Sequence, residues 1–149
     1  MKKLVRLYHF IISTIIYFIC NIAIANCSIT GADSLSFGSY NPLDSSDNIS
    51  QSNITIDCSG RRSFTVKLST GSSADYSQRK LYNNSNPLNY NIYLDTGFTS
   101  IWGDGTNNTN FYSNTNRGTD VIIAYGKIPA QQNISQGTYS DSIIVTLEF

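Results

Sequence analysis

Short runs of alternating apolar and polar residues recur along this chain and constrain its fold more than any other feature. In a β-strand successive side chains point to opposite faces, so a run of period two has one buried face and one exposed face. The runs occupy residues 34–40, 53–58, 63–69, 87–95, 119–128 and 137–149. Clusters of Gly, Asn, Ser and Asp separate them, and no sustained helical period occurs after residue 25. The pattern predicts an all-β sandwich of six or seven strands.

The same alternation predicts which side chains face the core. For the earlier runs the inward sets are Ile54, Ile56 and Cys58; Phe64, Val66 and Leu68; Leu88, Tyr90, Ile92 and Leu94; and Val121, Ile123 and Tyr125. In the last run they are Tyr139, Ile143, Val145, Leu147 and Phe149. Residues 137–149 are therefore predicted to form a core strand whose apolar face continues to the final residue.

The N-terminal segment has the form of a secretory signal peptide. Basic residues precede the apolar run of residues 10–25, which ends in the small-x-small pattern Ala23-Ile24-Ala25. A membrane anchor is the alternative, because residues 7–25 approach the length of a membrane span. We expect cleavage after Ala25, so that residues 1–25 form the signal peptide and residues 26–149 form one exported domain without a membrane span.

Cleavage at that point removes the imidazole side chain, on which much enzyme chemistry depends. The single histidine of the chain, His9, lies in the signal segment, which excludes Ser-His-Asp and Cys-His arrangements from the mature protein. The remaining carboxylates are mostly aspartates in turn-forming contexts, unlike the facing pair of a glycosidase. We therefore predict a protein that is not an enzyme and has no cofactor.

The charge and the turn sequences give no sign of a nucleic acid or a metal. Loss of Lys2, Lys3 and Arg6 leaves seven of the ten basic residues against ten acidic ones, a net charge of −3, whereas nucleic-acid partners usually need a basic face. Residues 104–110, DGTNNTN, alternate oxygen ligands but lack the glycine and the glutamate of a calcium loop. We expect an Asn-rich turn there and no metal site.

Two cysteines, Cys27 and Cys58, remain in a chain that is expected to enter an oxidising compartment. A disulfide between them is the default expectation. Closing a loop of about 32 residues stabilises a fold by roughly 3.5 to 4 kcal/mol in the chain-entropy model, before any strain is counted.

One connecting segment, residues 102–118, is long for a compact domain and mostly polar. Long loops at the end of a sandwich commonly bind ligands. Trp102, Phe111 and Tyr112 are therefore candidate contact residues for a glycan or an abiotic surface. The alternative for Trp102 is a buried position that plugs one end of the sandwich.

The order of motifs resembles the spore coat protein U domain family, which includes subunits of archaic chaperone-usher pili. The motifs, in order, are CSITGADSLSFGSYNP, ITIDCSG, FTVKLSTG, LNYNIYLD, WGDGT, AYGKIPAQQ and GTYSDSIIVTLEF. They cover the chain from Cys27 to Phe149, and the cysteine pair is placed as in the family.

This resemblance implies an incomplete immunoglobulin-like β-sandwich that lacks its final strand and is completed by a donor strand in trans. It also implies three partners: a periplasmic pilus chaperone, an outer-membrane usher and neighbouring pilin subunits, with export to the periplasm and then to the cell surface. The inward residues of the last strand, Tyr139, Ile143, Val145, Leu147 and Phe149, would form the groove for chaperone and donor strand.

Family pilins carry their own donor segment before the first cysteine, and here this sequence departs from the pattern. Cleavage after Ala25 leaves only Asn26 before Cys27, too little chain to span a groove at about 3.3 Å per residue. Such a subunit would receive a strand and give none, which predicts a position at the tip of a fibre. A self-contained secreted or envelope coat binding protein is the alternative function.

Overall fold

The computed structural model describes residues 25–149, so the expected signal peptide lies almost wholly outside the described residues. This part of the chain is built from strands with one short 3-10 turn, and none of its helices has the length and apolarity needed to cross a membrane. The elements are β1 (Cys27–Ala32), β2 (Asn48–Leu68), η1 (Gly71–Ser73), β3 (Arg79–Asn83), β4 (Asn86–Tyr93), β5 (Tyr112–Ile128) and β6 (Val145–Glu148). The predicted all-β sandwich is confirmed.

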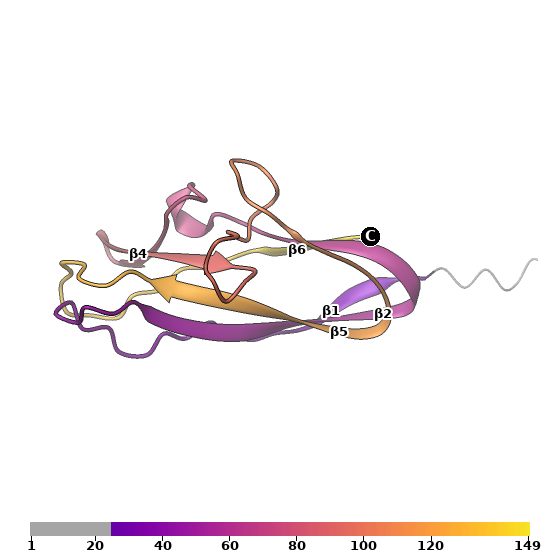
Figure 1. The fold of residues 1–149 in the computed structure, drawn as a ribbon, viewed down its shortest axis with the longest axis horizontal. Coiled ribbons are helices and arrows are strands. Elements are labelled where there is room, and N and C mark those ends of the chain that lie inside the picture. The colour runs from indigo at the N-terminus through magenta and orange to yellow at the C-terminus, as the bar shows by residue number, and fades with distance from the viewer. Residues whose placement is uncertain (1–24) are drawn as a thin grey trace, which may run out of the picture.

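Two long strands, β2 and β5, form the frame of the sandwich. They pair antiparallel over most of their length, with an irregularity in the register between Cys58 and Arg62. Near this irregularity the strand pair curls over, so that its two halves lie in opposite layers (Figure 1). The prediction of separate strands at 53–58 and 63–69 is therefore wrong, because a bend inside a continuous strand can carry it from one sheet to the other.

The remaining strands add to these two halves. One half of the ladder carries β1 on one side and β4 with β3 on the other, in the order β1-β2-β5-β4-β3. The other half carries β6, which pairs with Thr65 to Leu68 of β2. An isolated bridge between Tyr82 and Ser140 connects β3 to the segment that leads into β6.

The core lies between the layers and contains most of the predicted inward residues. The alternation correctly placed in it Ile54, Ile56, Cys58, Phe64, Val66, Leu68, Leu88, Tyr90 and Ile92. For β5 the prediction is wrong: the buried side chains are Ile122, Ala124 and Ile128, whereas Val121 and Ile123 are exposed. Apolar residues occupy both faces of this strand, so alternation cannot tell them apart, and the pairing of Ile54 with Ile122 sets the register.

Two further predictions about the chain path need correction. Residues 34–40 form no strand, because side chains replace the backbone ladder: Ser50 Oγ donates to the carbonyl of Ser36, and Asn48 Nδ2 donates to that of Phe37. The predicted loop at 102–118 is shorter than expected, since its second part, from Tyr112 onward, belongs to β5.

Candidate functional site

An open groove lies along one side of the sandwich. One wall is the segment 32–37, which continues from the last residue of β1, and the other is formed by Asp141 and Ile143, which precede β6, and by Val145, its first residue. The cavity between them has a volume of about 330 Å³. Its remaining lining is mostly apolar and comprises Ser52, Ile54, Leu68, Leu81, Tyr90, Ile92 and Ala124.

Both walls of the groove lead into strands with an unpaired edge. Within residues 25–149, β1 pairs with β2 alone, and β6 also pairs with β2 alone. The other edge of each strand therefore presents backbone N–H and C=O groups that have no strand partner in this part of the chain. An apolar groove next to such edges has the form of a vacant strand position, because an added strand could pair its backbone and bury alternate side chains.

The five residues predicted for the groove occupy three different environments. Ile143 and Val145 line the groove, and Leu147 follows on the same half-buried face of β6. Tyr139 packs against the core, and its hydroxyl donates to the carbonyl of Ser135. Phe149 is 49% exposed, and the Arg62 guanidinium lies 5.7 Å from the centre of its ring. Of the predicted set, the structure thus places Ile143 and Val145 in the lining and leaves Tyr139, Leu147 and Phe149 outside it.

One side chain crosses the groove from wall to wall. The ring of Tyr90 packs edge-on against Phe37, with 6.0 Å between ring centres, and its hydroxyl donates to Asp141 Oδ2 over 2.7 Å. Burial raises the pKa of Tyr90, and the hydrogen bond to Asp141 raises it further. The backbone N–H of Ser72 donates to the other oxygen of Asp141, which fixes the carboxylate. Tyr90 therefore ties the two walls together without filling the space between them.

Several of these lining residues were absent from the predicted set. Asp141 has the same parity as Tyr139 and Ile143, so its polar side chain on an apolar face was a signal in the sequence. Leu35 and Phe37 were visible in the alternating run 34–40. Ser52 carried no signal, because a serine at an inward position is indistinguishable from a surface serine without the strand register.

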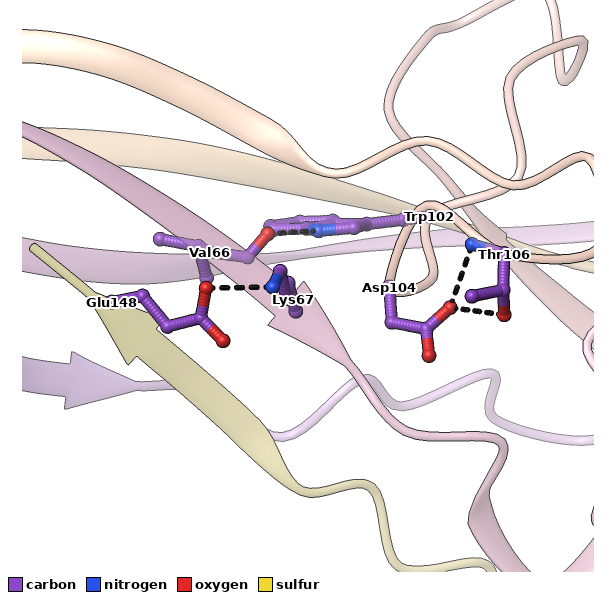
Figure 2. A network of polar contacts seen from close by, with 6 residues as sticks. All are labelled: Val66, Lys67, Trp102, Asp104, Thr106 and Glu148. Atoms are coloured by element: carbon purple, nitrogen blue, oxygen red, sulfur yellow. Dashed lines mark hydrogen bonds and ion pairs between the residues drawn. The ribbon is translucent and has the colours of Figure 1, made fainter.

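A second region of the sandwich, called here the closed side, is filled by Trp102, which is fully buried and does not line the groove. Its indole N–H donates to the carbonyl of Val66 over 2.9 Å, and its backbone N–H donates to that of Ile92 over 2.9 Å. Figure 2 shows the indole beside the Val66 carbonyl, with the Asp104–Thr106 turn nearby. Since Val66 and Ile92 belong to different layers, Trp102 joins the layers. Of the two predictions for Trp102, the structure supports the buried position and not the exposed contact residue.

A buried arginine reinforces this closed side. Arg79 is fully buried, and its guanidinium donates to the carbonyls of Ser69 and Trp102 and to the side-chain oxygen of Asn91. Burial lowers the pKa of Arg79. Its three acceptors are neutral oxygens from separate segments, so the side chain acts as a polar staple.

The other two candidate contact residues differ in exposure. Phe111 is 41% exposed, whereas Tyr112 is half-buried in β5 and donates its hydroxyl to Asp120 over 3.0 Å. Burial raises the pKa of Tyr112, and the Asp120 carboxylate adds to the effect. Of Trp102, Phe111 and Tyr112, only Phe111 has the exposure that a contact residue needs.

The predicted disulfide between Cys27 and Cys58 is confirmed. The two residues are directly opposite in the β1–β2 pair, so the bond fastens the start of β1 to β2. Within the described part of the chain, no group of three or more histidine, cysteine, aspartate or glutamate side chains is arranged to hold a metal ion.

Fold and groove together define a class of protein: a β-sandwich with an open apolar groove beside two unpaired strand edges. The chain belongs to the Spore Coat Protein U domain family, whose profile matches residues 18–146. It is 28% identical over 144 residues to Protein U of Myxococcus xanthus, an alignment that covers 83% of this chain and 77% of that protein.

A solved structure resembles the fold. It is the crystal structure of the CsuC–CsuE chaperone-tip adhesion subunit pre-assembly complex from the archaic chaperone-usher Csu pili of Acinetobacter baumannii. The TM-score is 0.63 at 25% sequence identity, and the match covers 85% of this chain. This chain spans 40% of the length of the chain it matches there.

Proposed function

We propose that this protein is a structural, non-enzymatic subunit of a surface pilus of the archaic chaperone-usher type. It is exported to the periplasm, held there by a pilus chaperone, passed to an outer-membrane usher and joined to neighbouring subunits at the cell surface. The groove between residues 32–37 and β6 receives the strand that the sandwich lacks, first from the chaperone and then from a neighbouring subunit.

The observation that carries this proposal is the combination of an apolar groove with two unpaired strand edges. Exposed edges of this kind favour aggregation unless they are covered. An inserted strand would add main-chain hydrogen bonds along both edges and would bury apolar side chains against Ile54, Ile92 and Val145. Family membership and the likeness to a chaperone-bound pilus subunit support the same occupant, a strand from another polypeptide.

The test is capture by a co-expressed periplasmic pilus chaperone. Replacement of Val145 and Leu147 by serine places two hydroxyl groups on the inward face of β6 and should abolish co-purification of the chaperone. Ile144→Ser is the matched control, because Ile144 lies in the same segment but is 69% exposed. Equal capture of the double variant and the control would contradict the proposal. So would a purified full chain that is monomeric and protease-resistant and gains no stability from any added strand, as expected of a self-contained coat protein.

A tip position with an adhesive surface is the finer form of this proposal. Phe111 lines a shallow depression together with Val121 and Ile123, and all three side chains are exposed. Such an apolar patch suits contact with an abiotic surface. Replacement of Phe111 and Val121 by serine should reduce adhesion of the fibre without changing chaperone capture, whereas unchanged adhesion would contradict the adhesive role.

The tip position itself depends on processing of the N-terminus. Sequencing of the mature N-terminus by mass spectrometry should find Asn26 as the first residue, since cleavage is expected after Ala25. Only Asn26 would then precede Cys27, and the mature chain would have no donor segment. A mature chain that begins ten or more residues earlier would retain a donor segment and would contradict the tip position.

A further inference from the structure

A largely buried serine lies in the lining of the groove. Ser52 faces inward from β2, is only 8% exposed and lines the groove with Ile54 and Ala124. Among residues 25–149 its Oγ makes no hydrogen bond, although the neighbouring inward serine, Ser50, donates to the carbonyl of Ser36. The open groove is therefore the route by which water reaches this hydroxyl.

The residues around Ser52 on the inner face of the sheet are small, which leaves space above its side chain. Its partner across the β2–β5 pair is Ala124, and the next inward pair is Ser50 with Gly126. Leu35 and Phe37 already occupy the space over Gly126, where an added Cβ would lie 2.6 Å from Leu35. The free space is therefore above Ser52 and Ala124, where an incoming strand would place a side chain.

Covering the groove changes the energetics of the hydroxyl. A strand with only apolar inward side chains would exclude water from Ser52 Oγ, and a buried hydroxyl without a partner costs about 1 to 3 kcal/mol. A hydrogen-bonding side chain above Ser52 would avoid that cost. An acidic one would not suit the site, because Asp33 and Asp141 are the charged residues of the lining and both are negative.

We propose that the groove selects a strand with a hydroxyl or amide side chain at one inward position, the position above Ser52. This inference rests on the proposed function, since it takes the groove to accept a strand of another polypeptide. The partner is then an extended segment whose inward residues are apolar except for one threonine, serine, asparagine or glutamine. Ser52 is a specificity-determining residue, because an unpaired hydroxyl penalises the wholly apolar strand.

The test measures binding of synthetic strand peptides to the purified full chain. The reference peptide has valine at every inward position, and each variant peptide replaces one valine by threonine, which has nearly the same size. One threonine position should bind about tenfold more tightly than the reference, the factor that corresponds to about 1.4 kcal/mol. Ser52→Ala should abolish this preference. Ser63→Ala, a change at an exposed serine of the same strand, should keep it.

The outcomes separate the inference from the proposed function. If every threonine peptide binds no better than the reference, or if the preference survives in Ser52→Ala, this inference is overturned while the strand-accepting groove stands. A full chain that binds none of the peptides overturns the proposed function, and this inference with it.

Discussion

Two regions of the sandwich, the closed side around Trp102 and the open side at the groove, differ in how the layers are joined. On the closed side Trp102 and Arg79 give hydrogen bonds to backbone carbonyls of several segments, including Val66 and Ile92. On the open side the Tyr90–Asp141 hydrogen bond crosses the groove, and the edges of β1 and β6 have no strand partner within residues 25–149. Stability and strand binding should therefore depend on different residues.

The largest expected effect comes from breaking the closed side. Trp102→Ala removes a fully buried indole and its hydrogen bond to Val66, and large-to-small changes of this kind cost about 3 to 5 kcal/mol. The free energy of unfolding, measured with urea on the full chain, should fall by that amount. Phe111→Ala, in the adjacent exposed loop, should change it by less than about 1 kcal/mol. Similar losses in the two variants would mean that Trp102 does not join the layers.

A change on the open side should affect strand binding more than stability. Gly126→Val places a side chain where Leu35 and Phe37 pack, so the segment 34–37 must move away from β5. Overpacking of this kind costs about 1 to 3 kcal/mol. Binding of strand peptides should fall at least tenfold, by titration, because one wall of the groove is displaced. Gly31→Ala is the control, since an added Cβ there meets ordinary contacts at 3.5 Å. Unchanged binding in Gly126→Val would mean that the segment 34–37 does not contribute to strand binding.

The closed side was less predictable from the sequence than the strands around it. Alternation identified Val66 and Ile92 as inward residues because each lies in a run where one face alone is apolar. It left Trp102 undecided, since a tryptophan in a Gly- and Asn-rich segment has no periodic neighbours. Arg79 was not foreseen at all, because an arginine is normally exposed and its burial here depends on oxygen atoms of three other segments, at Ser69, Asn91 and Trp102.

The open side was predictable in its location and not in its detail. The apolar face of residues 137–149 and the family likeness pointed to β6, and Ile143 and Val145 do line the groove. The second wall was missed, because Leu35 and Phe37 reach it only through the side-chain hydrogen bonds of Ser50 and other residues of β2. Contacts between segments far apart in the chain leave no local pattern in the sequence.

Removal of the Tyr90 hydroxyl should eliminate the hydrogen bond that joins Tyr90 to Asp141 across the groove. Tyr90→Phe keeps the ring against Phe37 and removes the hydrogen bond to Asp141, a loss of about 1 to 2 kcal/mol at neutral pH. Because burial raises the pKa of Tyr90, the folded state retains the proton after the unfolded state has lost it. Stability from this group is thus complete below pH 10, roughly the unfolded pKa, and is lost above it.

Urea midpoints between pH 8 and pH 11 would measure that difference. The wild-type protein should lose stability above about pH 10 more steeply than Tyr90→Phe. The variant should keep a smaller slope, because burial also raises the pKa of Tyr76, Tyr93 and Tyr112. Equal slopes would show that the hydroxyl of Tyr90 remains open to solvent in the unfilled groove.

The smallest effect is expected on the outer face of β6, where Glu148 pairs with Lys67 at 2.6 Å (Figure 2). The side chains are 54% and 26% exposed, so water screens the pair, and Glu148→Gln should cost at most about 1 kcal/mol, less in high salt. Strand-peptide binding should not change, since Glu148 points away from the groove. A loss of binding comparable to that of Gly126→Val would mean that the ion pair, rather than the backbone pairing with β2 and the inward side chains, holds β6 in place.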